Sequence, residues 1–297
     1  MKTDLLRSAL QAVKPLVEQV PAVASVFRAM RDALPVLDEP EPTPLGFKLA
    51  GNPAMMAGTF EPEETQVIRE ILERRKIDTF VNIGANIGYY CCLARSLGVD
   101  VVAIEPIERN LRYLLRNLKA NGWVDRVEVF PVALSSAPGL VDIYGGGTGA
   151  SLVKGWANIP ERYVRLVPCS TLDNLLATRL VGKRALVLVD IEGAERRMLE
   201  GAKQVLAAQP APIWMVEISS TEHQPHGQTI NPDLLSTFEL FWSAGYVSVT
   251  ANAARRKIEK EEVARVAAGG GNTLGTHNFL FSTPGEMPLL MPRQTHK

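Results

Sequence analysis

The sequence predicts an α/β fold with a doubly wound, mostly parallel sheet. From about residue 79 onward, short apolar runs alternate with segments of helical periodicity, and the connections between them are short. Glycines and acidic residues recur where the apolar runs end, and sheets of this kind bind ligands outside the carboxyl ends of their strands. The 297 residues allow one large α/β domain with an additional arm.

The composition is that of a globular protein with a sizeable core, because 46% of the residues are hydrophobic and 22% are charged. Lys plus Arg and Asp plus Glu both number 32, so no basic field indicates nucleic acid as a partner. Three cysteines are too few for a disulfide framework, and we expect a cytoplasmic protein. No apolar run reaches the roughly 18 to 20 residues that cross a bilayer. Lys14 and Glu18 interrupt the first apolar stretch, which argues against a secretory signal.

Residues 1–46 form an N-terminal helical arm and a linker in this interpretation. Apolar residues recur at roughly helical spacing over residues 4–33, with breaks at Pro15 and Pro21. We expect a helical arm that packs on its own domain or on a partner subunit, as in a homo-oligomer. Peripheral docking at a membrane surface is the alternative. Residues 34–46 hold four prolines and three acids, which is typical of an extended linker, so the main domain is 47–297.

The predicted strands share short runs of β-branched and aromatic residues. They are residues 79–83, 99–104, 127–134, 141–144, 185–189, 212–218, 246–249 and 277–281. The predicted helices share apolar residues at helical spacing, with proline or acids near several starts and glycine at several ends. They are residues 61–76, 88–97, 106–121, 171–176, 193–206 and 232–243. The helix at 106–121 presents Leu111, Leu114, Leu115 and Leu118 on one face.

Two segments interrupt the alternation of strands and helices. The glycine-rich stretch at 145–149 lacks the Gly-Lys-Ser/Thr ending of a phosphate loop, so we expect a flexible, exposed turn on the substrate side. Residues 251–275 are a charged insertion that ends in glycine.

The loop after the strand at 79–83 is the first candidate ligand site. Gly84 and Gly88 bracket a turn that contains Asn86, a plausible helix N-cap. Backbone N–H groups and a helix dipole meet there, and glycines let a ligand approach the backbone closely. The spacing is not that of a dinucleotide-binding turn, because no glycine stands at position 86. A tight strand-to-helix connection is the alternative interpretation.

Glu105 ends the next strand and lies 21 positions after Gly84. A carboxylate at about this offset takes the two hydroxyls of a ribose, since its two oxygens fit a cis-diol. The glycine loop and this acid together predict an adenosine-containing ligand.

Acidic and imidazole groups follow the later strands. Asp190 and Glu192 come after the strand at 185–189, and Glu217 ends the strand at 212–218. His223 and His226 lie on the loop beyond it. Each of these groups is a candidate general base, although Glu192 can also cap a helix and a loop histidine is commonly solvated. A weak divalent-metal site built from the same acids and histidines is possible, but we do not predict it.

Two blocks of sequence resemble the FkbM-type methyltransferases. The first is Asn82-x-Gly84-Ala85-Asn86-x-Gly88 followed by Ile104-Glu105-Pro106, Asn110, Leu114, Asn117 and Asn121-Gly122. The second is Thr171-Leu172-Asp173 followed by Asp190-Ile191-Glu192-Gly193-Ala194-Glu195 and Leu199-x-Gly201-Ala202. The resemblance runs from about Gly58-Thr59-Phe60-Glu61-Pro62 to Phe281 and leaves out the N-terminal arm.

This resemblance implies a class I, Rossmann-like methyltransferase fold with seven strands, the last one antiparallel, and S-adenosylmethionine as the cofactor. It implies that Gly84, Asn86 and Gly88 hold the methionine part, that Glu105 binds the ribose, and that residues 132–134 lie beside the adenine. It also implies O-methylation of a sugar, glycolipid or polysaccharide hydroxyl. Position 82 is usually Asp in the family, so Asn82 removes a negative charge near a cationic cofactor.

The sequence therefore predicts an S-adenosylmethionine-dependent O-methyltransferase with a sugar or glycoconjugate acceptor. The expected cofactor residues are Asn82, Gly84, Ala85, Asn86, Gly88, Glu105, Pro106, Ala133 and Asp190, and the expected catalytic residues are Asp190, Glu217 and His223. A nicotinamide-dependent sugar oxidoreductase or epimerase is the first alternative, disfavoured because the sequence has no Tyr-x-x-x-Lys pair. A non-catalytic cofactor-binding relative is the second alternative.

Overall fold

A computed structural model describes residues 36, 38–74, 76–176 and 178–291. The predicted helical arm over residues 4–33 lies outside the described residues. From Asp38 onward the chain forms one compact unit. Two short antiparallel strands, β1 (Glu41–Pro42) and β2 (Lys48–Leu49), open this unit within and just after the expected linker. No helix among the described residues is long and apolar enough to span a bilayer.

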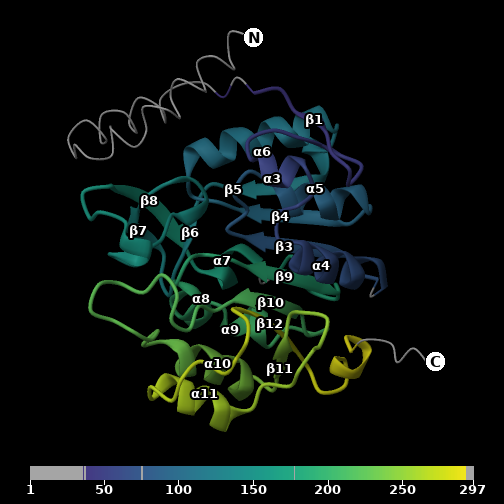
Figure 1. Ribbon diagram of the computed structural model, residues 1–297. Helices are drawn as coiled ribbons and strands as arrows, with labels where there is room; N and C mark the ends of the chain where they lie inside the picture. The colour runs from purple at the N-terminus through teal and green to yellow at the C-terminus, as the bar shows by residue number, and fades with distance from the viewer. Residues whose placement is uncertain (1–35, 37, 75, 177, 292–297) are drawn as a thin grey trace. The chain divides into compact units, whose positions relative to one another are not determined.

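The main sheet has seven strands in the order β11-β12-β10-β9-β3-β4-β5 (Figure 1). Their bounds are β3 Thr79–Ile83, β4 Asp100–Ile104, β5 Val127–Phe130, β9 Ala185–Val189, β10 Ile213–Glu217, β11 Val247–Thr250 and β12 Asn278–Ser282. The strands from β10 through β9, β3 and β4 to β5 pair in parallel. The last strand, β12, runs antiparallel to both β10 and β11. The predicted doubly wound, mostly parallel sheet is confirmed.

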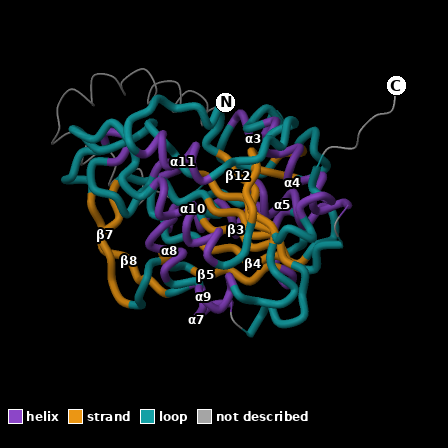
Figure 2. Tube along the Cα trace, turned by 90° about the horizontal axis from the view of Figure 1, so that it is seen from below, coloured by secondary structure: helices purple, strands orange, loops and turns teal. Residues whose placement is uncertain are grey.

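Helices cover both faces of the main sheet. Their bounds are α4 Pro62–Arg74, α5 Tyr89–Ser96, α6 Glu108–Ala120, α7 Leu172–Leu176, α8 Glu195–Glu200, α9 Lys203–Leu206, α10 Leu234–Ser243 and α11 Lys260–Ala267. Figure 2 shows α4 and α5 on one side of the strands and α8, α10 and α11 on the other. Because strand residues alternate between faces, Val81 and Ile83 join the core shared with α7–α11, whereas Asn82 points toward α5.

Asn117 on α6 and Asn121, the residue that caps the C-terminus of α6, connect the start of the compact unit to the region of the loop after β3. The buried Asn117 accepts a hydrogen bond from the Ala50 N–H at 2.8 Å and donates one to the Ile87 carbonyl at 2.8 Å. Asn121 accepts from the Lys48 N–H at 2.8 Å and donates to its carbonyl at 2.7 Å. The segment around β2 therefore supports the loop that follows β3, since these backbone groups have few other partners.

A smaller sheet, in the order β6-β8-β7, follows β5 in the chain. Its bounds are β6 Ala133–Leu134, β7 Gly139–Tyr144 and β8 Val164–Ser170. The single strand predicted over 127–134 is therefore wrong: Pro131 has no N–H to donate, so β5 ends before it and β6 joins another sheet. We did not predict β8, whose Val164 and Leu166 are 44% and 62% exposed and lack the pattern of a buried strand.

Three helical details also differ from the prediction. Leu115 is 46% exposed, because the buried face of α6 is centred on Leu114 and Asn117. The helix predicted over 193–206 is two short helices, α8 and α9, with a break at Gly201. Gly201 packs closely against the backbone of Ser135, because a Cβ on it would lie 2.4 Å from the Ser135 carbonyl oxygen. The charged insertion over 251–275 contains α11.

Candidate functional site

The loop after β3 contacts the segment that follows β9. Gly84 has a φ of +82°, and a Cβ on it would lie 1.8 Å from the carbonyl oxygen of Asp190. The N–H groups of Gly84 and Ala85 both donate to the Ile104 carbonyl at 3.0 Å. Position 84 therefore requires glycine for two reasons: its backbone is left-handed, and the segment that ends β9 leaves no space for a Cβ.

The predicted helix N-cap at Asn86 is wrong. Asn86 has a φ of 50°, and α5 begins only after Gly88, whose φ is 87°. A Cβ on Gly88 would lie 3.1 Å from Leu114 Cγ, so this glycine permits α5 to pack on α6 and does not line the cavities described below. Asn86 Oδ1 is buried and has no hydrogen-bond partner within the described residues, so it is available to a ligand.

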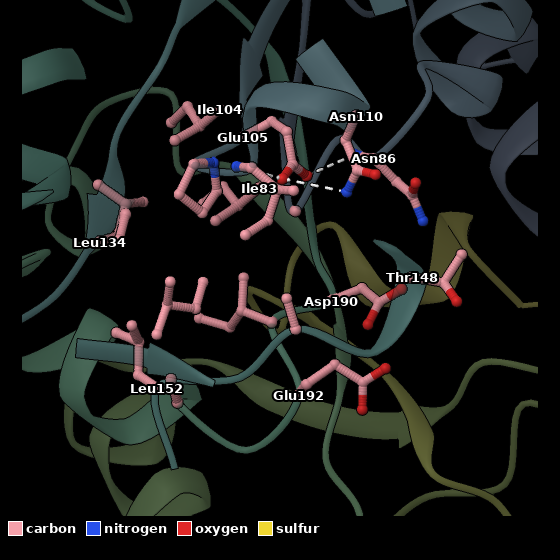
Figure 3. A pocket seen from close by; sticks show the side chains of 18 of the residues that line it. Ile83, Asn86, Ile104, Glu105, Asn110, Leu134, Thr148, Leu152, Asp190 and Glu192 are labelled. Carbon is pink, nitrogen blue, oxygen red and sulfur yellow. Dashed lines mark hydrogen bonds between the residues drawn. The ribbon is translucent and has the colours of Figure 1, made fainter. Parts of the chain in front are cut away.

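Glu105 is held in a fixed orientation at the end of β4. One carboxylate oxygen accepts from the Asn86 N–H at 2.8 Å, and the other accepts from the Ile107 N–H at 2.8 Å and from Asn110 Nδ2 at 3.2 Å (Figure 3). Burial raises the pKa of Glu105 to about 7, although these hydrogen bonds favour its charged form. A carboxylate has about four lone-pair positions and three are used by these bonds, so about one position remains for a ligand hydroxyl.

An inner pocket of about 580 Å³, counted to its open mouth, lies between Glu105 and Asp190. Its largely apolar wall includes Val132, Ala133, Leu134, Ile143, Leu152 and Ile191. The glycine-rich segment also lines it through Gly147 and Thr148, and Asn110 Nδ2 donates to the Gly147 carbonyl at 3.0 Å. Within the turn expected to be exposed at 145–149, Thr148 is exposed, whereas Gly145 is buried and Gly147 is half-buried and held at the pocket by Asn110 of α6.

An outer chamber of about 1020 Å³ adjoins the inner pocket. It shares Gly84, Asn86, Thr148, Asp190 and Glu192 with the inner pocket. The remaining lining residues are Asn52, Met55, Phe60, Glu61, Ala85, Tyr89, Tyr90, Glu217, Ser219, Glu222, His223 and His277. The three predicted catalytic residues thus lie at one cavity, together with several acids.

Asp190 and Glu217 share a side-chain hydrogen bond between the ends of β9 and β10. Burial and the adjacent Glu217 raise the pKa of Asp190 well above its usual value. Burial and the charge of Glu192 raise the pKa of Glu217 to about 8. Because the hydrogen bond favours the charged form of Glu217 and the neutral form of Asp190, Asp190 keeps its proton, while Glu217 loses its own proton as the pH rises toward 8.

Glu61 also faces the outer chamber, and the sequence analysis did not select it as a site residue. Tyr90 donates a hydrogen bond from its hydroxyl to Glu61 Oε2 at 2.7 Å. Burial raises the pKa of Glu61, while the Tyr90 hydrogen bond opposes that rise. The family resemblance included Phe60-Glu61-Pro62, but Glu61 does not follow a predicted strand, which is the feature that identified the other candidate site residues.

Aromatic residues near the chamber are mostly structural. Trp156 is buried, its Nε1 donates to Glu192 Oε2 at 2.7 Å, and its ring centroid lies 6.0 Å from that of His223. The hydrogen bond from Trp156 fixes the Glu192 side chain where the inner pocket meets the outer chamber. His223 lines the outer chamber, whereas His226 lines neither cavity.

Asn82 lies behind the glycine loop and lines neither cavity. It is buried, and its Nδ2 donates to the Cys91 sulfur on α5 at 3.4 Å. Its Oδ1 has no hydrogen-bond partner within the described residues.

Of the predicted cofactor residues, Gly84, Ala85, Asn86, Glu105, Pro106, Ala133 and Asp190 line one or both cavities, while Asn82 and Gly88 do not. In the described part of the chain, no group of three or more His, Cys, Asp or Glu residues is arranged to hold a metal ion.

The seven-stranded sheet with an antiparallel last strand, and the pocket at its carboxyl edge, define a class I methyltransferase fold. The chain belongs to the FkbM methyltransferase family, because the Methyltransferase FkbM domain matches residues 82–248, more than half of its length. This confirms the resemblance seen in the sequence, and the family uses S-adenosylmethionine as its methyl donor.

The chain is also similar to several solved structures. One is the methyltransferase FkbM from Methylobacillus flagellatus, at 17% identity and a TM-score of 0.44, covering 79% of this chain and 56% of that one. Another is the O-methyltransferase from Bacillus cereus in complex with SAH, at 12% identity and a TM-score of 0.38, covering 76% and 82%. A third is Aeropyrum pernix fibrillarin with bound S-adenosyl-L-methionine, at 8% identity and a TM-score of 0.36, covering 69% and 65%. No curated protein sequence matches the chain.

Proposed function

We propose that this protein is an S-adenosylmethionine-dependent O-methyltransferase that acts on a hydroxyl group of a sugar, glycolipid or polysaccharide. The observation that carries the proposal is the junction of the inner pocket and the outer chamber at Asp190. Methyl transfer to a hydroxyl needs a bound methyl donor and a proton acceptor beside the oxygen. Two joined cavities, one with an oriented Glu105 and one lined by carboxylates, supply both requirements.

The inner pocket fits S-adenosylmethionine. Glu105, with Pro106 beside it, would accept a hydrogen bond from the ribose, and Ala133 with its apolar neighbours would lie against the adenine. The unpartnered Asn86 Oδ1 would accept a hydrogen bond from the methionine ammonium group, next to Gly84 and Ala85. Asp190 borders the same end of the pocket and would face the methyl-bearing sulfur.

The carboxylates of the outer chamber would remove the acceptor proton. The hydroxyl oxygen attacks the methyl carbon in line with the departing sulfur, so positioning supplies much of the rate. Glu217 is the favoured base, because its pKa of about 8 lies near a working pH and Asp190 holds it by a hydrogen bond. His223 lines the same chamber and is the second candidate base.

The lining of the outer chamber supports an uncharged acceptor. The half-buried Phe60 gives it aromatic surface, and its acids provide several hydrogen-bond acceptors for hydroxyl groups. Among the described residues, no lysine or arginine lines the chamber, so a phosphate or carboxylate next to the reactive hydroxyl would lack a counter-charge. A glycan hydroxyl satisfies these conditions.

Calorimetry with S-adenosylmethionine, S-adenosylhomocysteine and NAD, followed by labelled-methyl transfer to cell-envelope glycans, tests the proposal. We expect both sulfur compounds to bind, NAD not to bind, and label to appear in a glycan. Glu105→Ala should lose both sulfur ligands, whereas Glu217→Gln should still bind S-adenosylhomocysteine but lose turnover. Binding of NAD without either sulfur compound would overturn the proposal in favour of a nicotinamide-dependent sugar enzyme.

A non-catalytic cofactor-binding relative is the second candidate function, and Asn82 favours it. The amide removes the negative charge that the family usually has at this position and leaves Oδ1 without a partner within the described residues. Cofactor binding by the wild type with no methyl transfer, together with methyl transfer gained by Asn82→Asp, would support this candidate.

We further propose that the protein works in the cytoplasm and that residues 4–33 contact a second subunit or a membrane surface. The cytoplasmic proposal is supported by Cys91, Cys92 and Cys169, which are all buried and free of disulfides. Cell fractionation tests the location, and removal of residues 1–33 followed by light scattering tests the subunit contact.

A further inference from the structure

The inner pocket and the outer chamber meet at the residues that line both, of which Asp190 and Glu192 are acidic (Figure 3). If the cofactor lies in the inner pocket and the acceptor in the outer chamber, as in the proposed function, the methyl group must cross this junction. The sulfonium that carries the methyl group must then lie at the junction as well.

The ionisable groups facing the junction and the outer chamber are mostly acids. They are Glu61, Tyr89, Tyr90, Asp190, Glu192, Glu217, Glu222, His223 and His277, with the buried Glu195 acting on Glu217 by its charge. No lysine or arginine lines either cavity in the described ranges. Burial and repulsion between the acids raise the pKa of Glu61 and Glu217, so these carboxyl groups tend to keep their protons. A positively charged ligand can replace those protons and balance the carboxylate charge instead.

We propose that this junction selects the cofactor by charge: it binds S-adenosylmethionine more tightly than S-adenosylhomocysteine, and Glu61 is a specificity-determining residue for that difference. The two compounds carry the same amino and carboxylate groups and differ only in the S-methyl group with its positive charge. Attraction between that charge and partly buried carboxylates is stronger than in water, because the effective dielectric constant is lower.

Methyl transfer removes the cause of the attraction. A lone pair of the acceptor oxygen forms the new bond to the methyl carbon, and the electron pair of the carbon–sulfur bond stays on sulfur. The hydroxyl proton passes to a carboxylate such as Glu217. The product state therefore contains an uncharged sulfide and one more proton on the acids. Because the sulfur no longer balances a carboxylate charge, the proposal predicts that S-adenosylhomocysteine is released readily.

Glu61 is the acid best suited to test this selection. It comes from the segment before α4, so it does not support the sheet edge as Asp190 and Glu217 do. Its charge acts on both of those acids, which places it within electrostatic range of the junction. Tyr90 holds its carboxylate at 2.7 Å, and a glutamine would keep an oxygen for that hydrogen bond while removing the charge.

The test is calorimetry of the full chain with S-adenosylmethionine, S-adenosylhomocysteine and sinefungin, whose amine carries a positive charge near the position of the S-methyl group. We expect the wild type to bind the two cationic ligands about tenfold or more tightly than S-adenosylhomocysteine. Glu61→Gln should weaken both cationic ligands about tenfold and leave S-adenosylhomocysteine within about twofold. Glu63→Gln, the same change at an exposed position on α4, is the control and should alter neither affinity.

Equal affinities of the wild type for S-adenosylmethionine and S-adenosylhomocysteine would overturn charge selection. Equal weakening of both ligands by Glu61→Gln would overturn the role of Glu61. In either case the proposed function stands, because both ligands still bind. Failure of both sulfur ligands to bind would instead overturn the proposed function itself.

A pH series on the wild type tests the same proposal without a substitution that could unfold the chain. The acids gain charge as the pH rises: Glu105 in the inner pocket loses its proton near pH 7, and Glu217 in the outer chamber loses its proton near pH 8. The affinity for S-adenosylmethionine relative to S-adenosylhomocysteine should therefore increase from about pH 6 to about pH 9. A ratio that does not change over this range would overturn the proposal.

Discussion

Replacing Gly84 by alanine should damage the protein far more than replacing Gly98, although both glycines have nearly the same backbone. Gly84 has a φ of +82° and Gly98 a φ of +83°, so the conformational cost of a side chain is about 1 kcal/mol at each position. The surroundings differ. A Cβ on Gly98 meets no atom within 4 Å, whereas a Cβ on Gly84 lies 1.8 Å from the Asp190 carbonyl oxygen.

A carbon and an oxygen atom normally approach to about 3.3 Å, so the loop after β3 and the segment after β9 must separate by about 1.5 Å in Gly84→Ala. This shift strains the hydrogen bond from the Asp190 N–H to the Ile83 carbonyl, 3.0 Å long, and those from the loop to the Ile104 carbonyl. At about 1 kcal/mol for each of the three bonds, together with the conformational cost of about 1 kcal/mol, the total loss is about 4 kcal/mol, against about 1 kcal/mol for Gly98→Ala.

Thermal unfolding followed by circular dichroism measures the difference, and calorimetry with S-adenosylmethionine measures the effect on the site. For a domain of this size we expect the Tm to fall by about 8–16 °C in Gly84→Ala and by about 2–4 °C in Gly98→Ala. Only Gly84→Ala should weaken cofactor binding, because it displaces Asp190. Equal losses of Tm in the two variants, with cofactor binding unchanged, would refute the reasoning from the contact.

Three other predictions concern the buried side chains of Glu195, Cys91 and Glu105. Burial raises the pKa of Glu195 to about 8, so the folded state keeps a proton that the unfolded state loses above the ordinary pKa of a glutamate. The stability that this bound proton contributes is present at low pH and is lost as the pH rises toward 8. Glu195→Gln should remove on the order of 4 kcal/mol of that pH dependence in urea titrations at about pH 5 and about pH 8, and an unchanged slope would contradict it. Burial raises the pKa of Cys91 to about 12, and Cys92 shares its helix, so iodoacetamide should label both thiols only after unfolding; rapid labelling of the native protein would disprove their burial. Glu105→Gln should weaken S-adenosylmethionine at least about tenfold, because an amide offers one acceptor oxygen in place of two, and unchanged affinity in calorimetry would remove Glu105 from the ribose site.

The main sheet was predictable because its strands are short, mostly apolar and, in its centre, largely buried. The strand at Ala185–Val189 has the predicted bounds, since all five residues are buried and polar residues follow at once. The smaller sheet was not predictable in the same way, because β8 exposes Val164 and Leu166 and β6 has only two residues. Its strands depend on pairing with one another across the chain, and local sequence patterns do not record such pairing.

The candidate site was predictable where its residues lie at strand ends and less so elsewhere. Glu105, Asp190 and Glu217 come to the carboxyl edge because parallel strands place their ends together. The interpretation of Gly84 needed the structure, because the atom opposite it belongs to Asp190, more than 100 positions away. Glu61 reaches the chamber from outside the sheet, and no periodicity in the sequence indicates that path.

The two cavities differ in their relation to the region that defines the family. Every residue lining the inner pocket lies within the matched residues 82–248. The outer chamber takes Asn52, Met55, Phe60 and Glu61 from before that region and His277 from after it. Relatives that resemble one another across the matched region can therefore keep a common methyl donor while their flanking segments diverge. On this basis, the flanks rather than the family hallmark are the place to look for differences in acceptor between relatives.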